Sequence, residues 1–399
     1  MYIPASKILE RYASVLIDYA LANGKGVKPR EVVYLQYDSP ALPLALTVYQ
    51  HILNKGANVI LKQYNESFEK VFFQTANNDQ LDFFPKKFQK SLINLIDHRI
   101  YLIAPKDPFY LKEINPKKIV RANQHKTQIR KWLFDKEDKG KLTWTLCLYG
   151  TEEMAKEAGL SLGQFWNQII NACYLDQKNP IIQWQRVYKK IHEIRDKLNL
   201  LPIDKIHIKA KKTDLWLKLG EKRKWVGGSG QNIPSFEIFT SPDWRGTNGY
   251  IFFDLPLYRY GNLIKDIYLE FKQGRVVKAK ANKNEQLLKQ IIKQKNADKV
   301  GEFSLTDKRL SRIDQFMANT LYDENYGGKF GNTHLALGTS YHETFTGKVK
   351  EQKTSDWNKL GFNESAEHMD IIAKQDRVVE VVLHDKSKKL IYRKGQFMI

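Results

Sequence analysis

The residues best suited to chemistry lie in the second half of the chain, where four of the nine histidines fall between residues 334 and 384. His368 and Asp370 form the sharpest pattern among them. In a strand or an extended turn, residues two apart point to the same side, so an imidazole and a carboxylate can meet one cation. A lone His-x-Asp pair is more often a surface pair than a metal site, so this pattern needs partners from elsewhere in the chain.

Two carboxylates in apolar surroundings are candidate partners. Glu237 lies within Ser235-Phe-Glu-Ile-Phe239, and Glu302 lies within Val300-Gly-Glu-Phe-Ser304. A carboxylate in an apolar strand is costly unless it is paired or bound to a cation. Hydrogen bonding to a neighbouring Arg or to the backbone is the alternative explanation for each.

Two familiar catalytic patterns occur in the wrong context. Gly159-Leu-Ser-Leu-Gly163 matches the GxSxG nucleophile pattern, but it follows a helical stretch, and Ser161 with Gln164 predicts a capping box that opens the next helix. Gly24-Lys-Gly26 precedes its strand, whereas a dinucleotide-binding loop follows one. We therefore expect neither a serine nucleophile nor a bound nucleotide.

The first 200 residues alternate helical and strand patterns, which favours a parallel sheet covered by helices. The expected strands lie at residues 31–37, 57–62, 99–104 and 142–148. The expected helices lie at residues 8–19, 41–55, 67–95, 117–132, 162–175 and 180–198.

From residue 205 the pattern changes to short strand-like runs separated by turns that carry Gly and Asn, which is typical of antiparallel sheet. The expected strands lie at residues 205–209, 213–219, 236–240, 250–254, 267–271 and 276–279, and a hairpin is expected from residues 377–383 and 389–393. One helix follows Asn284, which we predict to be its N-cap. We place a domain boundary near residue 204.

The net charge of +21 is spread evenly along the chain. Residues 1–200 carry 30 basic and 20 acidic side chains, and the remainder carries 35 and 24. The densest basic stretch, residues 117–141, is interpreted as a solvated surface rather than a nucleic-acid face, so nucleic acid is not an expected partner.

The sequence also bears on the cellular compartment. No segment approaches 18 uninterrupted apolar residues, and charged residues interrupt the first twenty positions, which predicts neither a membrane span nor Sec export. Cys147 and Cys173 form no CxxC pair and no disulfide framework. We expect a cytoplasmic protein without a zinc ribbon.

Six ordered stretches over about 140 residues of the second half carry a family resemblance. They are residues 231–242, 272–277, 301–303, 321–325, 334–338 and 363–370. In these stretches the chain resembles the metallo-aminopeptidase family of thermostable aminopeptidase T, AmpS and PepS. The resemblance implies a set of metal-centre positions, namely Glu237, Glu302, His334, Tyr341, His368 and Asp370. The link between Glu324 and His334 is longer here than in the best-known members of that family.

The resemblance implies a dinuclear centre for Zn, Co, Mn or Mg ions, because carboxylates, imidazoles and a phenol suit such ions better than a closed thiolate site. A metal-bound hydroxide would attack the scissile carbonyl, with Glu302 as the bridging carboxylate. Tyr341 would either bind metal or stabilise the oxyanion, so Glu302 and Tyr341 are the expected catalytic residues. One metal or a nearby carboxylate would hold the free α-amine of the substrate.

These expectations combine into one prediction. The protein is expected to be an aminopeptidase that acts on peptides with a free N-terminus and forms a homodimer. An α/β N-terminal domain with a parallel sheet, residues 1–204, would support the dimer and the cleft. An α+β C-terminal domain rich in antiparallel sheet, residues 205–399, would carry the metal site. The alternative is a metal-binding or nucleic-acid-associated protein that kept the fold without the activity.

Overall fold

The computed structural model describes residues 2–124 and 126–399, and its first sheet has five parallel strands. Their order is β2-β1-β3-β4-β7. The first four strands confirm the predicted ones, and the interior of β1 is buried, as expected of a parallel strand covered on both faces. The bounds are β1 (Val32–Asp38), β2 (Asn58–Tyr64), β3 (His98–Ile103), β4 (Thr143–Leu148) and β7 (Asn232–Ile233).

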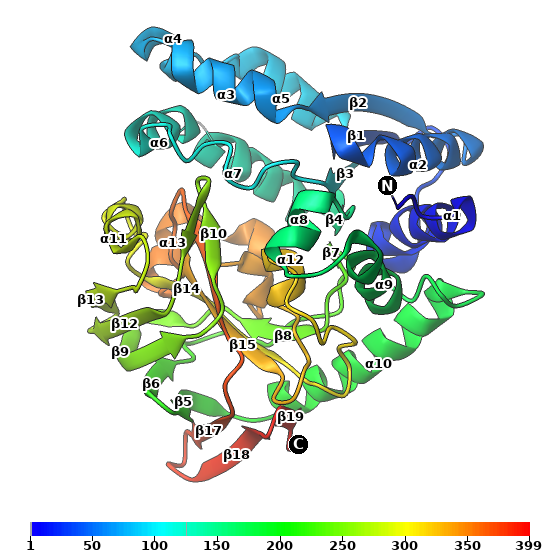
Figure 1. Cartoon of the computed structure of the whole chain (residues 1–399). Coiled ribbons are helices and arrows are strands. Elements are labelled where there is room, and N and C mark those ends of the chain that lie inside the picture. Colours follow the sequence, from blue (N-terminus) through cyan, green and yellow to red (C-terminus); the bar gives the residue numbers. More distant parts are fainter. Residues whose placement is uncertain (1, 125) are drawn as a thin grey trace.

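Helices cover both faces of this sheet (Figure 1). α1 and α2 pack together on one side, whereas α5 and α7 pack together on the other. A π-helix, Val15–Ala20, continues α1. The α-helices of this half are α1 (Ser6–Ser14), α2 (Leu42–Asn54), α3 (Glu66–Thr75), α4 (Asn78–Asp82), α5 (Lys86–Leu95), α6 (Pro116–Asn123), α7 (Lys126–Glu137), α8 (Glu152–Glu157), α9 (Leu162–Ala172) and α10 (Pro180–Asn199).

The segment predicted as one helix over residues 117–132 is two helices. The backbone N–H of Gln124 donates to the carbonyl of Arg121, three residues back, so α6 ends in a tight turn. α7 then begins at Lys126 and continues to Glu137. The break lets the two helices take different directions over the sheet.

The predicted capping box at the start of α9 is confirmed. The hydroxyl oxygen of Ser161 accepts a hydrogen bond from the backbone N–H of Gln164 at 3.3 Å. The backbone N–H of Ser161 donates to Gln164 Oε1 at 2.9 Å. Ser161 therefore caps a helix after another helix, which excludes a nucleophile elbow.

The second half of the chain contains an eight-stranded antiparallel sheet in the order β13-β12-β9-β6-β5-β17-β18-β19. It includes the predicted C-terminal hairpin, β17 with β18. The bounds are β5 (Ile203–Ala210), β6 (Thr213–Lys218), β9 (Asp243–Phe253), β12 (Ile267–Lys272), β13 (Arg275–Lys280), β17 (Arg377–Leu383), β18 (Lys388–Arg393) and β19 (Gln396–Phe397).

A four-stranded antiparallel sheet in the order β16-β15-β14-β8 lies within the same half. Every residue of β14 and β15 is buried. The strands are β8 (Glu237–Thr240), β14 (Val300–Thr306), β15 (Asn332–Gly338) and β16 (His368–Ala373). The remaining elements are the pair β10 (Leu257–Arg259) and β11 (Asn262–Ile264), with α11 (Glu285–Ile292), α12 (Thr320–Asp323) and α13 (Thr354–Lys359).

Asn284 stands at the predicted start of α11 but does not cap it with its side chain. Its backbone is left-handed, with φ of 58°, and its Nδ2 donates to the carbonyl of Leu263 at 2.8 Å. The side chain therefore ties the helix to β11 instead of satisfying a helical N–H.

The chain thus has a mixed α/β fold with one parallel sheet and several antiparallel sheets. The boundary near residue 204 stays a prediction. β7 lies beyond it in the sequence yet pairs with β4 in the parallel sheet. The main apolar core also runs through both halves, since Trp184 of α10 stacks on Phe236, with ring centroids 5.4 Å apart.

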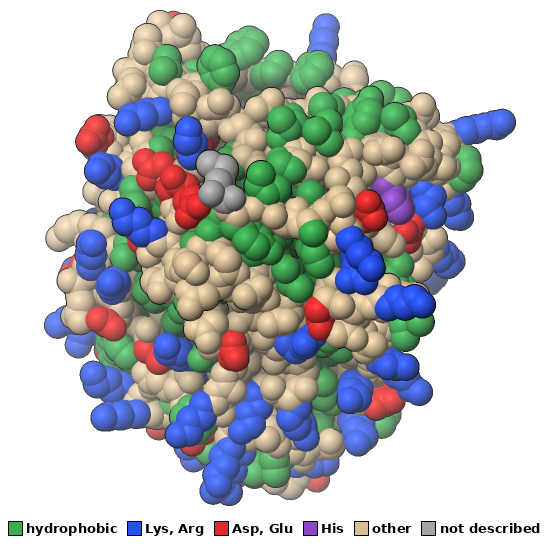
Figure 2. All heavy atoms as spheres, turned by 45° about the vertical axis from the view of Figure 1, so that its right-hand side comes forward, with side chains coloured by type: hydrophobic (Ala, Val, Ile, Leu, Met, Phe, Trp, Pro, Cys, Tyr) green, Lys and Arg blue, Asp and Glu red, His purple; other side chains and the backbone are tan. Residues whose placement is uncertain are grey.

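Surface charge follows the even distribution seen in the sequence. On the face drawn in Figure 2, Lys and Arg side chains are scattered over the lower part, with acidic side chains between them. Among the described residues, the helices are too short or too polar to cross a membrane.

Candidate metal centre

The four-stranded sheet brings five of the six predicted ligand residues together. Glu237 begins β8, Glu302 lies in β14, His334 lies in β15, and His368 and Asp370 lie in β16. Because the four strands are neighbours in the sheet, their side chains on one face converge. The His-x-Asp pair lies in a strand, which is one of the two conformations in which residues two apart point to the same side.

Two groups of potential ligand atoms form within this cluster. Glu237, Glu302 and His334 make one group, and Glu302, His368 and Asp370 make the other, with the ligand atoms of each group within 4.8 Å of one another. His334 Nε2 lies 3.2 Å from Glu302 Oε1 and 3.3 Å from Glu237 Oε2. His368 Nε2 lies 3.3 Å from Glu302 Oε2 and 3.3 Å from Asp370 Oδ1. Glu302 therefore offers one oxygen to each group.

Burial and mutual charge perturb every pKa in the cluster. Burial raises the pKa of Glu237 to about 7, against the attraction of His334. Burial also opposes ionisation of Glu302 and Asp370, but hydrogen bonds from the two imidazoles lower the pKa of Glu302, and His368 lowers that of Asp370 to about 2. Burial disfavours a charged His368, yet Asp370 and Glu302 raise its pKa to about 10. Without metal, the cluster holds protons that a divalent cation would displace.

The donor set fits divalent cations. Glu302 and His334 are 3% and 1% exposed, so their charges have little access to water. The Nε2 atom of His334 has three carboxylate oxygens within 4.0 Å, and one N–H cannot satisfy all three. Carboxylates and imidazoles without thiolates suit Zn, Co, Mn or Mg ions. Cys147 and Cys173 lie elsewhere, unpaired in the apolar core.

A backbone contact orients one of the two imidazoles. His368 Nδ1 lies 2.8 Å from the carbonyl oxygen of Thr339, which fixes Nδ1 as the donor and turns Nε2 toward the carboxylates. His334 has no such partner, because its buried Nδ1 contacts no acceptor among the described residues.

The predicted residue Tyr341 lies beside the cluster rather than in a strand. Its ring packs edge-on against His368, with centroids 4.8 Å apart, and against Phe239 at 5.8 Å. Burial and the nearby charges of Glu302 and Asp370 raise its pKa well above the usual range. All six predicted residues line one cavity of about 70 Å³, so both roles proposed for Tyr341 stay open.

Comparison with known proteins shows the family to which the chain belongs. The profile of the peptidase M29 family, described as thermophilic metalloprotease, matches residues 5–397. The chain belongs to this family. It is 26% identical over 414 residues to aminopeptidase AmpS of Bacillus subtilis and likewise to aminopeptidase PepS of Streptococcus thermophilus, with 98% of both chains covered in each case. The structure of wild-type AmpT from Thermus thermophilus has the same fold, with a TM-score of 0.83 and 22% identity over 99% of this chain and 100% of that one.

Membership of the M29 family confirms the resemblance predicted from the six stretches. It also shows that the chain is a metallopeptidase, a hydrolase of peptide bonds with a divalent metal cofactor. The alternative of a non-enzymatic metal-binding or nucleic-acid-associated protein is not favoured by these matches.

Two carboxylates in the cavity of this metallopeptidase were not predicted as site residues. Glu324 is 6% exposed, its Oε1 accepts from Asn232 Nδ2 at 3.1 Å, and burial beside Glu237 raises its pKa well above the usual range. Glu343 follows Tyr341 by two residues, and burial raises its pKa to about 8. Glu324 lies in one of the stretches that carry the resemblance, which could have indicated it, whereas no sequence signal marks Glu343.

Both halves of the M29 chain enclose the cavity. Trp144 of β4 lines it together with Ser229 and Gln231 from the segment before β7. Two larger pockets, of about 370 and 380 Å³, adjoin it and share Trp144 and Tyr341 with it. α7 contributes Phe134 to both of these pockets, so a helix of the first half lines the space next to the candidate metal centre.

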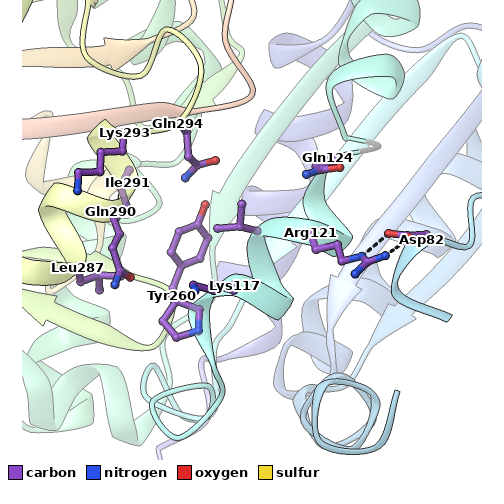
Figure 3. Close-up of a pocket in the computed structure, with 12 residues that line it drawn as sticks. Asp82, Lys117, Arg121, Gln124, Tyr260, Leu287, Gln290, Ile291, Lys293 and Gln294 are labelled. Carbon is purple, nitrogen blue, oxygen red and sulfur yellow. Dashed lines mark hydrogen bonds and ion pairs between the residues drawn. The ribbon is translucent and has the colours of Figure 1, made fainter. Parts of the chain in front are cut away.

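A separate pocket of about 580 Å³ lies between α6 and α11, away from the metal centre (Figure 3). Among its lining residues, Asp82 carries the one carboxylate, and it pairs with Arg121. Leu287 and Ile291 of α11 face Tyr260 across the hollow. A single paired carboxylate does not suit a divalent metal, so this larger space is not the site of the chemistry.

Proposed function

We propose that this metallopeptidase is an aminopeptidase that removes N-terminal residues from peptides and uses two divalent cations. One observation carries the proposal: the ligand groups Glu237-Glu302-His334 and Glu302-His368-Asp370 share the carboxylate of Glu302 on one buried sheet face. Relatives that match 98% of this chain are named aminopeptidases. Bound cations supply Lewis-acid activation of a water nucleophile and of the scissile carbonyl.

The protein residues around the centre have distinct tasks in this proposal. Glu302 holds negative charge between the two imidazoles, which keeps both ligand groups at a fixed separation. The phenol of Tyr341 stands at the wall of the cavity, where it binds metal or donates to the oxyanion of the reacting carbonyl. Glu343 lines the same cavity and an adjoining pocket, so its carboxylate can accept hydrogen bonds from the α-ammonium group of the substrate.

We further propose a homodimer that uses the N-terminal half. Hydrophobic side chains gather on the upper part of the face drawn in Figure 2. α2 contributes exposed leucines, with Leu42, Leu46 and Leu53 exposed by 46%, 61% and 49%. Apolar side chains grouped in this way favour a protein interface. Light scattering would show a monomer if the proposal is wrong, and Leu46→Glu should weaken a dimer that forms.

The aminopeptidase proposal is tested with one peptide in two forms, with a free or an acetylated N-terminus. Loss of a well-used charged contact costs about 2 to 5 kcal/mol, so acetylation should slow cleavage by roughly 30-fold to several thousand-fold. Mass spectrometry should show stepwise loss of single residues from the free peptide. Internal cleavage of both forms at similar rates would instead make the protein an endopeptidase.

A further inference from the structure

The pocket of about 380 Å³ beside the metal centre is lined by two arginines of the first half. Arg99 lies in β3 and Arg130 in α7, within the basic stretch of residues 117–141. Tyr341 and His368 of the candidate metal centre line the same pocket. The pocket therefore joins two guanidinium groups to the proposed site of the reaction.

Neither guanidinium forms an ion pair with a carboxylate in the part of the chain that the structure describes. Nε and Nη2 of Arg99 both donate to the neutral amide oxygen of Gln36, at 3.1 and 2.8 Å. Nη1 of Arg130 makes long contacts to Thr339 Oγ1 at 3.3 Å and to the carbonyl of Ser365 at 3.5 Å. The Nε and Nη2 groups of Arg130 have no acceptor among the described residues. Partial burial lowers the pKa of both side chains.

Two carboxylates near the arginines are occupied by other donors, whereas Asp135, Asp138 and Glu364 line a neighbouring pocket together with Arg130. Glu367 accepts hydrogen bonds from Arg259 and Tyr260. Glu137, which also lines the pocket, accepts at Oε1 from Trp144 Nε1 at 3.0 Å and from Gln231 Nε2 at 2.9 Å. A partly buried cation without a paired anion is costly, and the planar fork of Arg suits a carboxylate. The pocket therefore offers an anionic ligand a guanidinium that makes no ion pair among the described residues.

We propose that Arg130 binds the C-terminal carboxylate of short peptides whose first peptide bond is cut at the metal centre, with Arg99 adding positive charge behind it. The inference rests on the aminopeptidase function proposed above. Arg130 contacts Thr339, whose carbonyl accepts from the ligand residue His368, so the guanidinium lies one residue away from the centre. Because an extended residue spans only about 3.3 to 3.6 Å, the proposal concerns short peptides such as tripeptides.

The test compares the tripeptide Leu-Gly-Gly carrying a free C-terminus with its C-terminal amide, using the metal-loaded full-length enzyme. A bidentate hydrogen bond between charged groups favours the free acid by about ten- to a hundredfold in kcat/KM. Arg130→Gln should abolish this preference by lowering kcat/KM for the free acid much more than for the amide. Lys131→Gln removes one positive charge from the exposed side of the same helix and should keep the preference.

Each contrary outcome has a separate meaning. Equal hydrolysis of acid and amide by the wild-type enzyme overturns the role of Arg130 and leaves the aminopeptidase function intact. Equal losses on both substrates in Arg130→Gln, with unchanged melting temperature, show a structural contact and also overturn it. Failure of the wild type to cleave either substrate overturns the aminopeptidase function itself. If Arg130→Gln misfolds, the ratio of kcat/KM for the free acid and the amide in the wild-type enzyme still tests the proposal. Arg130→Lys keeps the positive charge but cannot make the bidentate hydrogen bond of a guanidinium, so it should show a reduced preference for the free acid.

Discussion

The carboxylate of Glu302 lies 3.2 Å from Nε2 of His334 across the β14–β15 pair, and its other oxygen faces the second ligand group. In the proposed arrangement of two cations, a residue shared by both ligand groups matters more for metal content than a residue used by one. The comparison between Glu302 and Glu237 therefore tests the shared carboxylate directly.

Glu302→Gln is expected to lose both metal ions, whereas Glu237→Gln should lose no more than one. The reason is that a neutral amide removes negative charge from both groups in the first case and from one group in the second. Metal content per chain, measured by elemental analysis after gel filtration, checks this. Glu364→Gln changes an exposed carboxylate near β16 and should keep the wild-type content. Equal metal loss from the Glu302 and Glu237 variants would contradict the shared role.

Removal of the metals by a chelator should abolish activity and lower the melting temperature, and a divalent cation should restore both. A cation that binds the folded chain stabilises it by about 2.7 kcal/mol at a hundred times its Kd. His334→Ala and His368→Ala should lose metal and turnover together while remaining folded, because the apolar core is independent of the site. Full turnover by verified metal-free protein would refute the metal dependence.

Tyr341→Phe should reduce kcat by about a hundredfold or more, because either proposed role requires the hydroxyl group. The phenyl ring keeps the packing against His368 and Phe239, so the melting temperature should not change. Metal analysis of the same preparation separates the roles. Full metal content with low kcat assigns Tyr341 to the oxyanion, and loss of one ion assigns it as a ligand. Wild-type kcat would remove it from the catalytic residues.

Gly301→Ala should displace Glu302 and reduce metal binding. A Cβ atom at residue 301 would lie 2.3 Å from the carbonyl oxygen of Thr339 and 2.5 Å from that of Gly338, so backbone must move next to the shared carboxylate. Gly163→Ala in α9 is the matched control, because its Cβ would meet nothing within 4 Å. That change should be neutral or stabilise by up to about 1 kcal/mol. Chemical denaturation and metal content of both variants are the measurements.

Asp18 provides a prediction for acid stability. Burial opposes its ionisation, but hydrogen bonds from His51, Lys55 and Ser14 outweigh burial and lower its pKa from 3.8 to about 2. Because the pKa of Asp18 is lower in the folded than in the unfolded chain, the ionised carboxylate stabilises the fold at pH values above the unfolded pKa. This contribution of about 2 kcal/mol is lost as the pH falls toward 2. Asp18→Asn should therefore unfold at a lower urea concentration than wild type at pH 7, and the difference between the two midpoints should shrink below about pH 4. A difference that stays constant with pH would rule out this role.

Local patterns predicted most elements because they depend on neighbouring residues. The apolar runs of β1 and β3 and the capping box at Ser161 were visible in the sequence for that reason. Asn284 was predicted as the N-cap of α11 and occupies that position, but its side chain donates to the carbonyl of Leu263 instead of capping the helix. β7, only two residues long, carries no periodicity that a sequence pattern could show.

The residues of the candidate site also divide into those that the sequence predicted and those that only the folded structure shows. His368 and Asp370 were paired by strand spacing, and the family resemblance supplied the partners from other strands. Glu343 and Arg130 were not predicted, because their place in the site depends on how α7 and the loop after β15 meet in space. In the sequence, Arg130 cannot be distinguished from the other basic residues of the stretch 117–141, because only the folded structure shows that it lines a pocket beside the site.

The pairing of β7 with β4 has a consequence for the order in which the chain is made. The first four strands of the parallel sheet are synthesised by residue 148, but the strand that covers the edge of β4 follows more than eighty residues later. Until then, the nascent chain on the ribosome presents β4 with unpaired backbone groups, which is a template for association with other chains. A recombinant fragment that stops at residue 204 would keep that open edge permanently, and it should aggregate where the full-length protein does not.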